Sequence, residues 1–199
     1  DIPASLAQIG YKVDVIDIES LSASSLAKYQ VVLLGIRAFN TVDALAYKNK
    51  ILFDWVKDGG TMIVQYNVSR GLVTEEIAPY LLTLSRDRIT EENAQVTMLS
   101  PDHEALNFPN KITQDDFIGW VQERGLYFPN KWDDAFTPLL EMNDTGETPT
   151  KGALLVAPYG EGYYVYSGLS WFRHLPAGNT GPYRLLSNLI SLGYKKGKS

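Results

Sequence analysis

The sequence predicts a single α/β domain whose sheet is mainly parallel, flanked by helices, and ends in an antiparallel hairpin. Residues 28–71 read as an apolar run, a polar loop, an amphipathic stretch, a Gly-Gly turn and a second apolar run, the order of a doubly wound sheet. Residues 153–169 hold two apolar runs around a Gly-Glu-Gly turn, which indicates a hairpin. The length of 199 residues suits one domain with its own core.

The elements can be placed in order along the chain. A short helix is expected over 2–9, ending at Gly10, and the alternating run 12–18 predicts a strand. The continuous apolar run 31–36 is typical of a strand buried on both faces, and residues 61–66 are expected to form the next buried strand. An amphipathic helix is expected between them over 43–58. The other expected elements are a helix within 73–85, strands over 96–100, 137–143, 153–160 and 162–169, and a closing helix over 180–193.

Composition excludes several classes of protein. The formal net charge of −5 argues against general affinity for nucleic acid, because phosphate contacts need clustered lysine and arginine. The one basic cluster, in residues 195–198, reads as a solvated terminus. No apolar run approaches the roughly 20 residues that a membrane helix needs. With no cysteine, the chain can form neither a disulfide, a thiolate zinc site nor a cysteine nucleophile.

The start of the chain is unusual for this fold class. Asp1 and Pro3 favour a helix start, whereas α/β domains usually begin with a strand. We therefore expect residues 1–199 to be a single domain cut from a longer protein, or one that lacks its first strand. A signal sequence could lie upstream.

Polar side chains follow the predicted strands, where sheets of this kind place their ligand sites. If the arginines converge, they would form a pocket for a carboxylate or phosphate, near the N-terminus of the last helix at Gly181. Alternatively, Arg173 pairs with a buried acid such as Asp115 and fastens its loop. The residues predicted to line one ligand-binding crevice are Arg37, Asn40, Tyr66, Asn67, Arg70, Arg173 and His174.

Two possible catalytic or metal sites have simpler interpretations. Ser69 would need His103 or His174 within hydrogen-bond reach, and its surroundings lack the Gly-x-Ser-x-Gly pattern, which favours a turn serine. Residues 102–104, Asp-His-Glu, are dense in metal ligands, but their spacing suits the start of a helix better. The sequence predicts no metal, no cofactor and no catalytic residue.

Acidic and aromatic residues gather between 115 and 134. Glycoside hydrolysis needs two carboxylates about 5–10 Å apart, and aromatic faces stack on sugar rings. The simpler interpretation is that the aromatic side chains cover one edge of the sheet while the acids are solvated; contact with a carbohydrate or another ligand stays open. The acids are Asp115, Asp116, Glu123, Asp133 and Asp134, and the aromatic residues include Trp120, Tyr127 and Trp132.

Three segments carry a family resemblance: GIRAFNT (35–41), DWVKDGGTMIVQYN (54–67) and KGALLVAPYGEGYYVYSGLSWFRHLPAGNTGPYRLLSNLISLG (151–193). They resemble the class I glutamine amidotransferase-like domain attached to bacterial PIG-L (LmbE-like) de-N-acetylases. ThuA-like domains and beta-galactosidase trimerisation-type domains share this broad fold. The resemblance covers nearly the whole chain and implies a flavodoxin-like sheet. It favours a periplasmic or extracellular location over a cytoplasmic one.

The resemblance also implies a role without catalytic activity. True amidotransferases use a cysteine at a strand-to-helix turn, and the matching turn here, QYNVSRG (65–71), holds Asn67 and Ser69 instead. We expect a non-catalytic accessory or ligand-binding domain of a larger deacetylase that acts on amino-sugar glycoconjugates. Its partners would be an upstream catalytic domain and a carbohydrate or anionic small ligand. The alternatives are a hydrolase with a serine or carboxylate centre, and a structural interaction module with an exposed apolar patch around Trp132 and Phe136.

Overall fold

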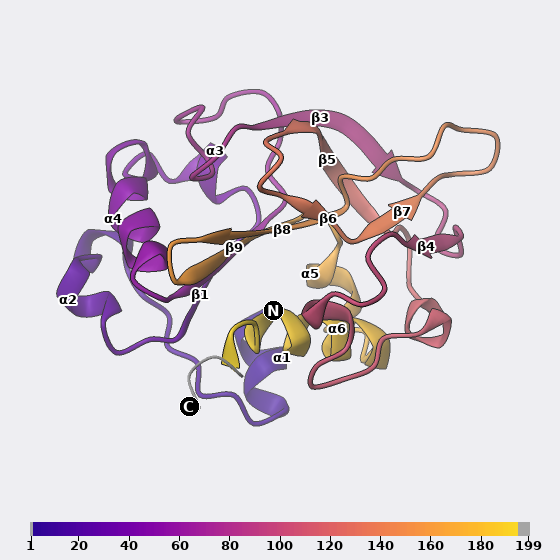
Figure 1. Ribbon diagram of the computed structural model, residues 1–199, viewed down its shortest axis with the longest axis horizontal. Helices are drawn as coiled ribbons and strands as arrows, with labels where there is room; N and C mark the ends of the chain where they lie inside the picture. The colour runs from indigo at the N-terminus through magenta and orange to yellow at the C-terminus, as the bar shows by residue number, and fades with distance from the viewer. Residues whose placement is uncertain (1, 195–199) are drawn as a thin grey trace.

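The computed structural model describes residues 2–194 and has a mixed α/β fold around a five-stranded sheet (Figure 1). The first three strands in the sheet are parallel, and the last two are antiparallel to their neighbours. A two-residue turn at 160–161 joins β8 to β9. In spatial order the strands are β1 (Val31–Leu34), β2 (Thr61–Gln65), β9 (Gly162–Ser167), β8 (Leu154–Tyr159) and β6 (Thr137–Pro138).

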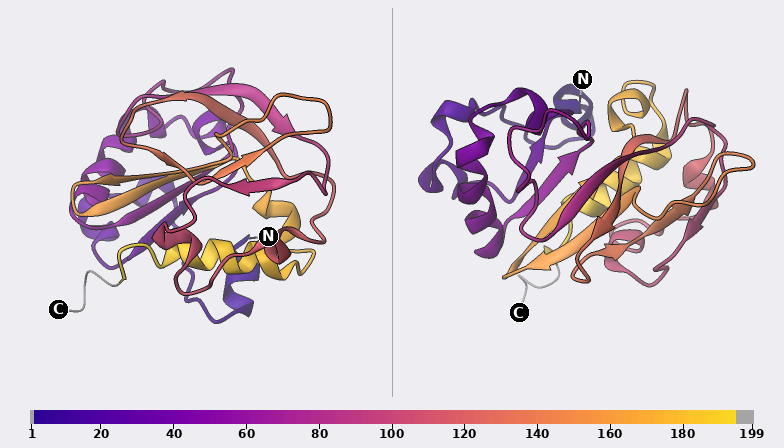
Figure 2. Two further views of the ribbon diagram at one scale, coloured as in Figure 1. Left: turned by 45° about the vertical axis from the view of Figure 1, so that its right-hand side comes forward. Right: turned by 90° about the horizontal axis from the view of Figure 1, so that it is seen from above.

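Helices cover both faces of this sheet. Along β2, Met62 and Val64 pack into the core that α4 shares, and Ile63 packs into the core that α1 and α6 share. Met62, Ile63 and Val64 are all fully buried, which explains why these three consecutive residues are apolar. Helices α1 and α6 lie together below the sheet in Figure 1, and Figure 2 shows the same ribbon from two further directions. The long helices are α1 (Ile2–Gln8), α4 (Leu45–Lys57) and α6 (Thr180–Ile190).

Short helices and two small antiparallel sheets complete the fold. One small sheet pairs β3 (Leu82–Ile89) with β5 (Gly125–Trp132), and the other pairs β4 (Val96–Met98) with β7 (Leu140–Met142). None of the helices described within residues 2–194 is long and apolar enough to cross a membrane. The short helices are η1 (Ile18–Ser20), α2 (Ala23–Leu26), α3 (Ala38–Thr41), η2 (Glu104–Leu106), η3 (Gln114–Phe117) and α5 (Trp171–His174).

The Gly-Gly turn ends α4 and aims the chain into β2. Gly59 has φ of 122°, a conformation that side chains disfavour, and a Cβ on Gly60 would collide with the Trp55 ring. Only glycine fits at both positions, so the turn directs β2 into the centre of the sheet.

Two predicted elements are wrong. Residues 12–18 form no strand: the backbone is irregular up to η1, and Val15 is 84% exposed. The expected helix within 73–85 is irregular up to residue 81 and then becomes β3. Pro79 lacks the N–H that a helix interior needs, and Leu82, Leu84 and Ile89 are buried between exposed neighbours, as in a strand.

Candidate functional site

Three aromatic rings gather where the parallel strands end, and we call them the aromatic platform: Tyr66, Tyr127 and Phe172. The Tyr66 and Tyr127 ring centroids are 6.1 Å apart with the planes 16° from parallel, and those of Tyr66 and Phe172 are 5.5 Å apart. Tyr66 follows β2, Phe172 lies in α5 after β9, and Tyr127 reaches the platform from β5. All three residues are half-buried, so each ring is both supported by neighbours and open to solvent.

An ion pair borders the platform on one side. The Arg173 Nε donates to Glu123 Oε1 at 2.7 Å, and the Ser170 hydroxyl donates to the same oxygen at 3.1 Å. The Arg173 guanidinium also lies 4.9 Å from the centroid of the Phe172 ring. The predicted partner Asp115 is therefore wrong, although the predicted fastening of the loop is present. The charges of Arg173 and Glu123 largely cancel.

Arg37 also lies beside Tyr66 of the platform. Its backbone N–H donates to the Tyr66 carbonyl at 2.8 Å, which ties the loop after β1 to the end of β2. The side chain is exposed and makes no hydrogen bond or ion pair with any residue from 2 to 194. The pKa of the Tyr66 phenol is raised, chiefly by burial; Arg37 opposes this shift, Glu123 adds to it and Arg173 opposes it. Tyr66 therefore feels all three charges at once.

Backbone strain is concentrated around the platform. Within the described chain, the non-glycine residues with positive φ are Arg37 at 57°, Gln122 at 67° and Tyr127 at 52°. Arg37 and Tyr127 belong to the site, and Gln122 directly precedes Glu123. The Gln122 N–H donates to the Glu92 carboxylate at 2.8 Å. Such conformations cost about 1–3 kcal/mol each and collect at ligand-binding and active sites.

The two predicted asparagines have their side chains occupied by the backbone. Asn67 is buried; its Oδ1 accepts from the Phe39 N–H at 2.9 Å, and its Nδ2 donates to the Gln65 carbonyl at 3.0 Å. Asn40 Nδ2 donates to the Val68 and Arg70 carbonyls, and its Oδ1 accepts from the Val68 N–H. Both residues shape the segment after β2, which includes the exposed Arg70.

His174 lies inside the protein, where a ligand on the surface does not reach it. Its imidazole is completely buried, with its centroid 4.3 Å from that of Trp120. Burial lowers the pKa of His174 to about 4, so the ring is neutral at physiological pH. The predicted anion position at the start of α6 is also not open among the described residues. Gly181 is buried there, and a Cβ on it would collide with the Asp116 carbonyl.

The catalytic alternatives find no support in the described residues. Ser69 makes no hydrogen bond to His103 or His174 there, and His103 instead accepts from the Ala105 N–H at the start of η2. No group of three potential metal ligands gathers anywhere between residues 2 and 194. Asp116 pairs with Arg184 at 2.8 Å.

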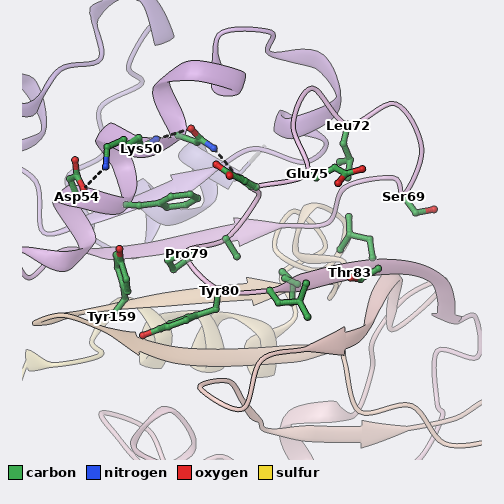
Figure 3. A pocket seen from close by; sticks show the side chains of 16 residues that line it. Lys50, Asp54, Ser69, Leu72, Glu75, Pro79, Tyr80, Thr83 and Tyr159 are labelled. Carbon is green, nitrogen blue, oxygen red and sulfur yellow. Dashed lines mark hydrogen bonds and ion pairs between the residues drawn. The ribbon is translucent and has the colours of Figure 1, made fainter.

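The apolar patch expected of an interaction module is also absent from its predicted place, because Phe136 is buried and Trp132 packs partly against the same core. A groove of about 670 Å³ lies elsewhere, between α4, residues 69–81 and β3 (Figure 3). Its walls include Phe53, Tyr80 and Tyr159. Neither the platform residues nor the predicted arginines line this groove.

Sequence reasoning missed part of the platform. Phe172 is absent from the predicted crevice, and its only signal is its place beside Arg173. Glu123 and Tyr127 belong to the acidic and aromatic segment with a possible sugar contact, but their meeting with Tyr66 depends on β5, a strand that the sequence did not predict.

No family model and no curated protein matches the chain, whereas solved structures do. A cytoplasmic protein from Salmonella typhimurium is 14% identical with a TM-score of 0.63, over 94% of this chain and 83% of that one. A protein described as a putative subunit of GMP synthase, from Thermoplasma acidophilum, is 8% identical with a TM-score of 0.60, over 99% and 88%. The beta-galactosidase from Rahnella sp. R3 is 15% identical with a TM-score of 0.56, over 96% of this chain but only 26% of that enzyme. At these identities the likeness shows a shared fold.

Proposed function

We propose that this chain is a non-catalytic domain whose aromatic platform binds a carbohydrate. Sugar rings offer apolar C–H faces that stack on aromatic side chains, and hydroxyl groups that need polar partners close by. The platform offers the solvent-open parts of three half-buried rings, and the charges of Arg37, Glu123 and Arg173 act on Tyr66 at its centre. The observation that carries the proposal is the left-handed backbone at Arg37, Gln122 and Tyr127, because such conformations in non-glycine residues collect at ligand-binding and active sites.

The proposed absence of catalytic activity is supported by the residue types and their contacts. The chain has no cysteine, and Ser69 has no histidine partner in the part described. Glu123 is held by Arg173 and Ser170, which suits a positioning role better than that of a nucleophile.

We further propose that the fold is of the flavodoxin-like, class I amidotransferase-like type and that the domain serves a larger, exported PIG-L-type deacetylase of amino-sugar glycoconjugates. The resemblance of residues 35–41, 54–67 and 151–193 supports this, and so does the likeness in fold to the Thermoplasma acidophilum protein described as part of a GMP synthase. The likeness to about a quarter of a beta-galactosidase supports an accessory role beside an enzyme. A full-length gene product without a zinc deacetylase motif would contradict this parent.

Calorimetric titration tests carbohydrate binding by the domain. The ligands are neutral, N-acetylated and acidic oligosaccharides. Replacing one ring, in Tyr127→Ala or Phe172→Ala, should weaken binding about tenfold, or about 1.4 kcal/mol. Tyr47→Ala is the matched control, because Tyr47 is 66% exposed on α4. Binding by none of the oligosaccharides, or an equal loss in the control, would refute the proposal.

A further inference from the structure

We propose that the platform selects acidic carbohydrates, with the carboxylate of a uronic acid paired to Arg37 while its ring stacks on the aromatic side chains. This inference rests on the proposed function and adds the class of ligand. Its first support is the state of Arg37: the guanidinium is exposed, and no acid between residues 2 and 194 pairs with it. A free cation beside ring faces is a ready partner for an anion.

The position of Arg37 is also fixed. Its N–H is bonded to the Tyr66 carbonyl, and its own carbonyl accepts from the Asn40 N–H at 2.8 Å and the Thr41 hydroxyl at 3.1 Å. The backbone is held in a left-handed conformation by these bonds. The backbone of Arg37 is therefore a rigid anchor beside Tyr66, so that only the side chain has to be ordered when a ligand binds.

The balance of charge at the site favours an anion. Among the charged groups that act on Tyr66, Glu123 is the acid, and Arg173 pairs with it at 2.7 Å. Arg37 keeps its charge, and the exposed Arg70 lies in the neighbouring loop that Asn40 holds. The site is thus locally positive in a chain whose formal net charge is −5.

A carboxylate on a sugar ring fits this arrangement better than a free anion. The planar guanidinium can bind a carboxylate through two parallel hydrogen bonds, and the ring that carries the carboxylate would lie over the platform. A sulfate ester on a sugar offers similar charge, but it is tetrahedral and is joined to the ring through an ester oxygen, whereas a uronic carboxylate is planar and is bonded to the ring carbon. The two sources of negative charge can therefore be separated by experiment.

The test compares three ligands on residues 1–199: trigalacturonate, its neutral methyl ester and a sulfated galactose trisaccharide. Trigalacturonate should bind about ten- to a hundredfold more tightly than its ester. The preference should shrink between about 0.05 M and about 0.5 M salt. Arg37→Gln should abolish it, and Arg37→Lys should keep only part of it. Arg86→Gln, which removes an exposed arginine on β3, should leave it unchanged.

The outcomes separate the two proposals. Equal binding of the acid and its ester would overturn the acidic preference and leave carbohydrate binding standing. Binding of no trisaccharide would overturn both. Tighter binding of the sulfated sugar, or an equal loss in Arg86→Gln, would overturn the pairing of a carboxylate with Arg37.

Discussion

Replacing Arg37 with glycine separates the function of this residue from its cost in stability. Arg37 has φ of 57° and ψ of 21°, a conformation that costs a residue with a Cβ about 1–2 kcal/mol. Glycine adopts this conformation freely, but its greater freedom in the unfolded chain lowers the free energy of unfolding by about 0.5–1 kcal/mol. The guanidinium is exposed and makes no hydrogen bond or ion pair within the described residues, so little packing is lost. Arg37→Gly should leave the free energy of unfolding unchanged or raise it by about 1 kcal/mol.

Urea unfolding and thermal melting measure this change. In a domain of this size, about 1 kcal/mol corresponds to a rise in Tm of about 2–4 °C. Arg37→Ala is the matched control, because it also removes the guanidinium but keeps a Cβ in the left-handed conformation. Both variants should lose the preference for acidic sugars, and only the glycine variant should gain stability. A loss of more than about 1 kcal/mol in Arg37→Gly would refute the strain, and a retained acidic preference would refute the role of the side chain.

Two further predictions concern the buried polar groups. Burial lowers the pKa of His174 to about 4, whereas the same imidazole in the unfolded chain takes up its proton near pH 6.5. The free energy of unfolding should therefore fall as the pH drops from about 6.5 to about 4. An imidazole NMR signal of the folded protein that titrates near pH 6.5 would contradict this. Asn67→Ala should cost about 3 kcal/mol in urea unfolding, since the buried Phe39 N–H loses its acceptor. Arg70→Gln in the same loop should change stability by less than about 0.5 kcal/mol, and equal effects would contradict the account.

The centre of the fold could be predicted because its strands carry their own signal. Residues 31–34 and 62–64 are apolar throughout, and the intervening helix shows one apolar stripe before the Gly-Gly turn. Residues 12–18 carry an equally good alternating pattern and still form no strand. The pattern reports which side chains favour burial, whereas a strand also needs a neighbouring backbone to bond with, which the sequence does not reveal.

The candidate site could be predicted in part for a related reason. Arg37, Tyr66 and Arg173 follow parallel strands, and the charges of both arginines act on the Tyr66 phenol, whereas a single crevice lined by all the predicted residues stays a prediction. Asn40, Asn67 and His174 occupy the same loops or the short helix after β9, but their polar atoms serve the backbone or lie buried. Whether a polar loop residue faces a ligand or its own main chain depends on turns that no residue type dictates.

An NMR titration of the isotope-labelled domain with trigalacturonate tests the central claim most directly. We predict saturable shifts of backbone amide signals concentrated at Arg37, Tyr66, Tyr127 and Phe172. Shifts concentrated instead at Phe53, Tyr80 and Tyr159 would place the ligand in the groove beside α4. That result, or an unchanged spectrum, would contradict the assignment of the aromatic platform as the binding site.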